Sequence, residues 1–297
     1  MRAIVSRAAA AAALALLGGL LVARAKAEDP PPAGASEPRL DDTGFEALPP
    51  AKPGEWRAEF PDEKPQSVSD YSRDVKNKAT PERRTIYIQP LGAIAKDHAA
   101  LLETTRAYCE VYFQCATKLL PPLDPPAKAW VKKRAQFDGD KLLRFLEPRV
   151  PADAIAVGGF LAEDIYSGDL NFVFGVATLE KRVGIYSTAR LEEKYAGMPA
   201  SAGLERRTIA VASHELGHMF GIQHCLFYRC VMNGSNSLEE SDGQPLLACP
   251  VDLEKLRRNV GFDPEKRLAD LEKFYEARGY GAEAAFCKAR RAGPVVR

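Results

Sequence analysis

Three of the four histidines in this 297-residue chain lie within eleven residues, in the run His214-Glu-Leu-Gly-His218-Met-Phe-Gly-Ile-Gln-His224. Apolar residues recur at helical spacing from Arg206 to Phe220, which predicts a helix with one apolar face. His214 and His218, four residues apart, then project side by side from another face of that helix. Two imidazole nitrogens placed in this way reach one zinc ion at about 2.0–2.1 Å.

The residues around these two histidines complete a catalytic type of site. Gly221 follows the helix where a left-handed residue turns the chain, and the turn brings His224 back as a third ligand. The fourth coordination position is left for water, as in catalytic rather than structural zinc sites. Glu215 is rotated away from the ligands and is placed to act as a general base. An isolated histidine is usually a hydrogen-bonded core or surface residue, and His98 receives that interpretation.

The cluster resembles the signature of the metzincin metallopeptidases, which it matches at every position. Cys225, Cys230 and Met232 follow at spacings similar to those of the archaemetzincin branch, and similar segments upstream extend the resemblance to about residues 84–260. The resemblance implies an α+β, zincin-type fold. Such a fold has a mixed β-sheet in an N-terminal subdomain, the active-site helix, and a smaller, mostly helical C-terminal subdomain. It also implies that Met232 packs beneath the three imidazoles as a Met-turn residue.

The function implied by the resemblance is zinc-dependent hydrolysis of peptide bonds, with one catalytic Zn2+ and Glu215 as general base. A peptide or protein substrate would lie along the edge strand of the sheet, a role assigned to Val183–Ala189. The second hypothesis is a non-catalytic zinc-binding module of the cell envelope. The intact Glu215 argues against it, because a structural site needs no base. The sequence makes no prediction of the oligomeric state or of endo- versus aminopeptidase action.

A second site implied by the resemblance is altered in this chain. The branch pattern continues to a Cys-x-x-Cys that completes a structural zinc site, whereas this chain reads Cys249-Pro-Val-Asp252. In one interpretation Asp252 joins Cys225, Cys230 and Cys249 as an oxygen ligand. In the other, which we favour, the metal is lost and these cysteines form disulfides in an oxidising compartment. Asp252 is also a candidate N-cap for a helix that begins at Leu253. Two further cysteines, Cys109 and Cys115, either form a local bridge or are buried thiols.

The first 27 residues have the form of a signal peptide. Arg2 and Arg7 precede an apolar run from Ala8 to Ala23, and Ala25-Lys26-Ala27 gives the small-x-small pattern that precedes cleavage. A membrane anchor is the alternative, because the run is only slightly shorter than a spanning helix. We predict export to the periplasm or out of the cell, with no stable membrane span after cleavage.

Residues 28–80 are expected to form a disordered tether or a pro-segment, and residues 81–290 one metallopeptidase domain. Nine of the 22 prolines fall between Pro30 and Pro65, and the apolar residues there follow no period. This segment contains no cysteine, so an inhibitory pro-segment would have to block the metal with Asp or Glu. The chain has 41 basic and 40 acidic residues, and loss of four basic residues with the signal peptide leaves 37 against 40. This balance excludes a general nucleic-acid-binding protein.

Strand and helix patterns alternate before residue 205, and helical patterns follow residue 250. Buried strands are predicted at 85–91, 154–160 and 171–175, and a less apolar strand at 183–189 is predicted to lie at a sheet edge. A helix is predicted over 97–108, with Asp97 as its N-cap. Asp263-Pro264 and Gly279 are typical of the beginning and the end of another helix.

Overall fold

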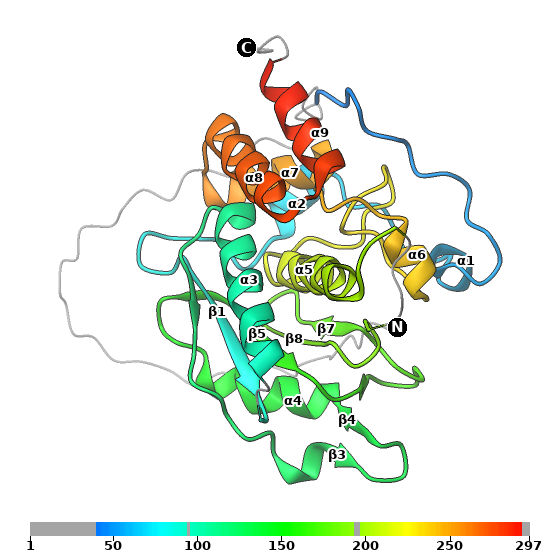
Figure 1. Ribbon diagram of the computed structural model, residues 1–297, viewed down its shortest axis with the longest axis vertical. Helices are drawn as coiled ribbons and strands as arrows, with labels where there is room; N and C mark the ends of the chain where they lie inside the picture. Colours follow the sequence, from blue (N-terminus) through cyan, green and yellow to red (C-terminus); the bar gives the residue numbers. More distant parts are fainter. Residues whose placement is uncertain (1–39, 94–95, 193–196, 293–297) are drawn as a thin grey trace, which may run out of the picture. The chain divides into compact units, whose positions relative to one another are not determined.

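A five-stranded mixed sheet lies at the centre of the fold (Figure 1). The computed structural model describes residues 40–93, 96–192 and 197–292. The strand order is β2-β1-β5-β8-β7, and neighbours are parallel except for β7, which runs antiparallel to β8. The strands are β1 (Thr85–Leu91), β2 (Thr117–Leu119), β5 (Ala154–Leu161), β7 (Gly175–Ala177) and β8 (Val183–Ser187). A small second sheet joins β3 (Trp130–Val131), β4 (Gln136–Asp138) and β6 (Ile165–Tyr166).

Helices cover both faces of the large sheet, so its central strands are buried along their whole length. The helices α3 (Lys96–Phe113) and α5 (Ala200–Met219) pack on one face, and α4 (Gly139–Leu146) packs on the other (Figure 1). Side chains alternate across the sheet as its pleat requires: Ile86 and Ile88 belong to the core under α3 and α5, and Tyr87 belongs to the core under α4. The fold therefore has two cores separated by one sheet, and the larger core carries the histidine helix.

The chain after residue 250 is helical, as predicted. The helices are α7 (Pro250–Val260), α8 (Pro264–Arg278) and α9 (Gly281–Ala292), and α8 packs against α3 and α9. Asp263 accepts hydrogen bonds from the first turn of α8, and Gly279 ends that helix with φ of +75°. Both of these predicted caps are confirmed. None of the helices in the described residues has the length and hydropathy that crossing a bilayer requires.

Four of the predicted elements are corrected. Residues 171–174 form a loop, exposed at Asn171 and half-buried after it, so that only Gly175 of the predicted strand belongs to β7. Since β7 pairs with β8, the predicted edge strand is an interior strand, and β7 takes the edge. The helix after residue 249 begins at Pro250 with Cys249 as its N-cap, which places Asp252 inside the first turn. The helix predicted to follow Asp97 already includes Lys96 and continues to Phe113.

The expectation of a disordered tether over 28–80 is wrong for residues 40–80. This stretch forms α1 (Trp56–Glu59) and α2 (Val68–Asp74), and Tyr71 belongs to the main core. Ser67 and Asp70 form a capping box at the start of α2. The stretch packs through single anchor residues and bonds from side chains to distant backbone groups, which leave no periodic signal in the sequence. The domain therefore begins well before residue 81, and the predicted signal peptide lies outside the described residues.

Candidate active site

His214 and His218 project from the last turns of α5 with their ring nitrogens facing each other. The Nε2 atoms are 3.0 Å apart. The Nδ1 of His214 lies 2.8 Å from the carbonyl oxygen of Val231, and that of His218 lies 2.7 Å from that of Ile222. Because carbonyl oxygens only accept, each Nδ1 carries the proton and each Nε2 presents a lone pair. Burial lowers the pKa of His214 to about 3 and that of His218 well below its ordinary value, so both rings are neutral.

His224 completes the cluster by way of the predicted turn. Gly221 ends the helix segment with φ of +84°, in the left-handed region that glycine adopts without strain. One ligand atom from each of the three histidines lies within 4.8 Å of the others. Two unprotonated nitrogens facing each other at hydrogen-bond distance repel unless a cation lies between them. The donor set therefore fits a zinc ion, for which neutral imidazole is a preferred ligand.

Glu215 lies directly beneath the edge strand. A Cβ atom built at Gly175 of β7 would lie 2.4 Å from the Glu215 carboxylate, so the strand backbone approaches this side chain as only glycine permits. Burial raises the pKa of Glu215 to about 8. A carboxylate with so high a proton affinity can accept a proton and pass it on near neutral pH.

Met232 packs against the same helix at the position predicted for the Met-turn residue. A Cβ built at Gly217 would lie 2.5 Å from the Met232 sulfur, so the thioether touches the helix backbone between His214 and His218. The loop after His224 returns to this point, with Cys225 N donating to Met232 O at 2.9 Å. Met232 is therefore buried against the part of α5 that carries both histidines.

The structure also brings together the second predicted group: Cys225, Cys230, Cys249 and Asp252. All four are buried, and their ligand atoms lie within 4.8 Å of one another. Asp252 Oδ2 lies 3.3 Å from Cys230 Sγ and 3.5 Å from Cys249 Sγ. The other carboxylate oxygen, Oδ1, accepts from the buried ammonium of Lys255 at 2.8 Å. All six cysteines are free thiols, including Cys109, Cys115 and Cys287.

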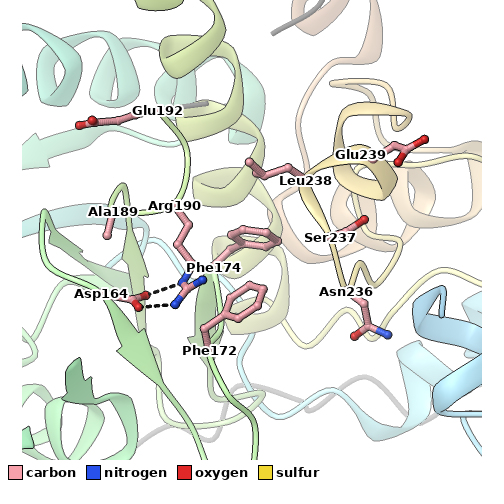
Figure 2. A pocket seen from close by; sticks show the side chains of 10 residues that line it. All are labelled: Asp164, Phe172, Phe174, Ala189, Arg190, Glu192, Asn236, Ser237, Leu238 and Glu239. Carbon is pink, nitrogen blue, oxygen red and sulfur yellow. Dashed lines mark hydrogen bonds and ion pairs between the residues drawn. The ribbon is translucent and has the colours of Figure 1, made fainter. Parts of the chain in front are cut away.

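A cleft of about 660 Å3 borders the approach to β7. Figure 2 shows Phe172 and Phe174 on one wall and Asn236, Ser237 and Leu238 on the other. The first wall leads directly into Gly175, and the second follows Met232 into α6 (Leu238–Asp242). Beside the rings, Arg190 forms a bidentate ion pair with Asp164 at 2.7 and 2.9 Å.

Sequence reasoning missed the residue that contacts His224 from outside the motif. Glu63 Oε1 lies 2.8 Å from His224 Nδ1. Burial alone would raise the pKa of Glu63, but the hydrogen bonds from His224 and Trp56 outweigh it and lower that pKa, so the carboxylate is ionised. The sequence signal was the presence of large aromatic residues, Trp56 and Tyr71 among them, in a proline-rich stretch. His98 keeps its simple interpretation, with its ring packed edge-on against Phe160.

Comparison with known proteins places this site in a family. A sequence model of peptidase family M54 matches residues 128–258. Archaemetzincin-2 of Macaca fascicularis is 30% identical over 279 residues, which cover 81% of this chain and 77% of that protein. The archaemetzincin of Methanocaldococcus jannaschii is 35% identical over 173 residues, covering 58% of this chain and 92% of that protein.

Solved structures agree with this assignment. The crystal structure of archaemetzincin from Archaeoglobus fulgidus is 31% identical, covers 58% of this chain and 99% of that one, and superposes with a TM-score of 0.50. That from Methanopyrus kandleri is 28% identical, covers 61% and 98%, and gives a TM-score of 0.53. The predicted zincin-like α+β fold is confirmed, and a non-catalytic binding module is not favoured. This chain belongs to the archaemetzincins, peptidase family M54, and is a zinc metallopeptidase that acts on peptide substrates.

Proposed function

We propose that His214, His218 and His224 hold the catalytic zinc ion and that Glu215 is the general base for peptide-bond hydrolysis. The observation that carries the proposal is the pair of neutral imidazole Nε2 atoms facing each other at 3.0 Å. Zinc held there supplies Lewis-acid polarisation of the scissile carbonyl and a lower pKa for the attacking water. Glu215 accepts the water proton during attack and delivers it to the leaving amine. Its buried position and its pKa of about 8 support both steps.

The test compares Glu215→Gln and Glu215→Ala with the wild-type protein. We expect peptide hydrolysis to fall by about 10²–10⁴-fold, the usual contribution of a general base, while zinc content is unchanged. Zinc is measured by atomic absorption on the same preparations. If either variant cleaves peptides at the wild-type rate with zinc bound, the role of Glu215 is wrong.

The substrate is proposed to lie along the free edge of β7 in place of the sequence-predicted edge at 183–189. An edge strand offers unpaired backbone groups to an extended peptide, and Gly175 sets this edge directly over Glu215. The cleft walled by Phe172, Phe174 and Leu238 then receives an apolar side chain of the peptide. Leu238→Arg should shift cleavage of a mixed peptide library away from apolar residues. An unchanged profile would contradict this use of the cleft.

A second, structural zinc ion is proposed at Cys225, Cys230, Cys249 and Asp252. The Sγ atoms of Cys225 and Cys249 are 3.5 Å apart. A disulfide requires about 2.05 Å, whereas two thiolates on one tetrahedral zinc lie about 3.8 Å apart, given a Zn–S distance of ~2.3 Å. The thiol separation therefore supports the metal and not the disulfides favoured from sequence. We expect two zinc ions per chain and six titratable thiols after denaturation in chelator. One zinc and four or fewer thiols would restore the disulfide interpretation.

Export is proposed on the sequence of residues 1–27. Mass spectrometry of the mature protein should find its N-terminus near Glu28, in the periplasm or the culture medium. An intact N-terminus on cytoplasmic protein would contradict export.

A further inference from the structure

The segment over residues 55–77 wraps around the end of the histidine helix. Three of its side chains donate to the carbonyls there: Asn77 to Met219 at 2.7 Å, Tyr71 to Phe220 at 2.8 Å and Gln66 to Gly221 at 3.1 Å. The last carbonyls of a helix have no partner inside the helix, so these bonds complete the C-terminal end of α5. We call residues 55–77 the brace.

The brace also holds the turn that carries the third histidine. The buried amide of Gln66 donates to Gly221 O and accepts from Gln223 N at 3.1 Å. One side chain thus spans the turn from its first residue to the residue before His224. A turn bonded at both ends has few alternative conformations, which fixes the backbone from which His224 projects.

Glu63 fixes the ring of His224 itself. One carboxylate oxygen lies 2.8 Å from His224 Nδ1, and the other accepts from Trp56 Nε1 at 3.0 Å. The Trp56 ring packs edge-on against the His224 ring, with centroids 5.0 Å apart and planes at 78°. Both oxygens of Glu63 are therefore engaged, and His224 is held from two sides.

Trp56 is in turn anchored to the loop that follows Met232. Its backbone N–H donates to the Glu240 carboxylate at 3.0 Å, and the same carboxylate accepts from Asn236 N at 2.7 Å. Its ring lies so close to Gly234 that a Cβ there would come within 2.3 Å. The helices α1 and α6 accordingly lie side by side (Figure 1). The brace is thus joined to the chain on both sides of the histidine turn.

We propose that Glu63 is a positioning residue of the metal centre, which holds His224 with Nε2 toward the other two histidines and makes it a more basic ligand. Carboxylates that bond to the outer nitrogen of a ligand histidine have this effect in other metal sites. Glu63 is not among the described residues whose ligand atoms converge on the cluster, so it acts through His224 and does not block the metal. The brace is then a permanent part of the centre and not a removable inhibitory segment. This inference rests on the proposed three-histidine site.

The experiment measures metal affinity instead of activity. Zn2+ dissociation constants are obtained by chelator competition, and the histidine site is followed by the visible absorption of Co2+, which differs between nitrogen and thiolate ligands. We expect Glu63→Ala to weaken binding about 10–100-fold and to change the Co2+ spectrum. Glu63→Gln keeps an oxygen for the Nδ1 proton but not the charge, so it should fall between Glu63→Ala and the wild type. It also tests the inference should Glu63→Ala fail to fold.

Glu59→Ala is the matched control, because this glutamate lies in the same segment but is exposed. It should bind metal as the wild type does. The urea midpoint of the metal-free protein separates positioning from a general structural role, which would lower the midpoint and leave the affinity of the folded protein unchanged.

Two outcomes separate this inference from the proposed function. If His214→Ala weakens binding at the histidine site and both Glu63 variants bind like the wild type, the role of Glu63 is wrong and the site stands. If His214→Ala also binds like the wild type, the three-histidine site itself is wrong.

Discussion

Gly217 and Met232 approach each other so closely that a residue larger than glycine has no room between His214 and His218. A Cβ at position 217 would lie 2.5 Å from the Met232 sulfur. Gly→Ala inside a helix ordinarily stabilises by about 0.5–1 kcal/mol. Here we expect Gly217→Ala to lower the free energy of unfolding by about 1–3 kcal/mol through overpacking. Urea denaturation of the metal-free protein measures whether Gly217→Ala raises or lowers the free energy of unfolding.

The double variant Gly217→Ala/Met232→Ala supplies the control. Removing the thioether relieves the collision, so the double variant should be more stable than the sum of the two single changes predicts. A Gly217→Ala protein at least as stable as the wild type would show that the helix moves freely away from Met232.

Residues of the site could be predicted from the sequence where they lie close to one another along the chain. The three histidines, Glu215 and Met232 were identified because eleven residues of helix and turn fix the histidine geometry and a known motif continues beyond it. Glu63 was not identified, because it lies 161 residues before His224, the residue that it contacts. An acidic residue in a proline-rich stretch has no feature that distinguishes it from a solvated one.

Among the elements, those with strong caps or long apolar runs were predicted well. The α8 helix follows from Asp263, Pro264 and Gly279, and β1 and β5 follow from their apolar runs. The edge strand was missed because β7 has only three residues, too few for an alternating pattern. The low apolar content of residues 183–189 wrongly indicated a strand at the sheet edge, since β8 is buried throughout.

Tyr71 tests how α2 stabilises the end of α5, the helix that carries His214 and His218. Its buried hydroxyl donates to Phe220 O at 2.8 Å and accepts from Asn259 Nδ2 at 2.7 Å. Tyr71→Phe removes one hydrogen-bond partner from Phe220 O and one from Asn259 Nδ2, and water does not reach this buried position to replace it. We therefore expect the free energy of unfolding to fall by about 1–3 kcal/mol. Tyr228→Phe, which removes an exposed hydrogen bond to Asp42, should cost less than about 0.5 kcal/mol. Equal effects of the two changes would contradict this role for α2.

Over the whole molecule, the fold class was predicted and the domain boundary was not. The α+β architecture was implied by the resemblance to the metzincins, and the helical C-terminal part followed from the helical patterns after residue 250. The boundary was placed at residue 81 because few side chains of residues 40–80 are buried, and each of these packs against a distant part of the chain. Such contacts follow no period and become visible only in three dimensions.

Truncation tests the corrected boundary. The reference is a chain that begins at residue 40, where the described part of the domain starts. A chain beginning at residue 81 loses Trp56, Val68 and Tyr71, each worth about 1.5–3 kcal/mol when buried, which together approach the 5–15 kcal/mol of a typical domain. We expect it to lose cooperative unfolding, as measured by circular dichroism. A cooperative transition at the wild-type midpoint in the shorter chain would reinstate the tether.

The distance in sequence between Glu63 and His224 also sets an order of events during biosynthesis. Glu63 is synthesised early and His224 late, so the third ligand meets its carboxylate only when most of the chain is available to fold. Metal would then be captured with full affinity as one of the last steps of maturation. If the export proposed above carries the chain across the membrane unfolded, that step falls after translocation. The peptidase would then stay inactive within the cell that makes it, even though the brace is never removed.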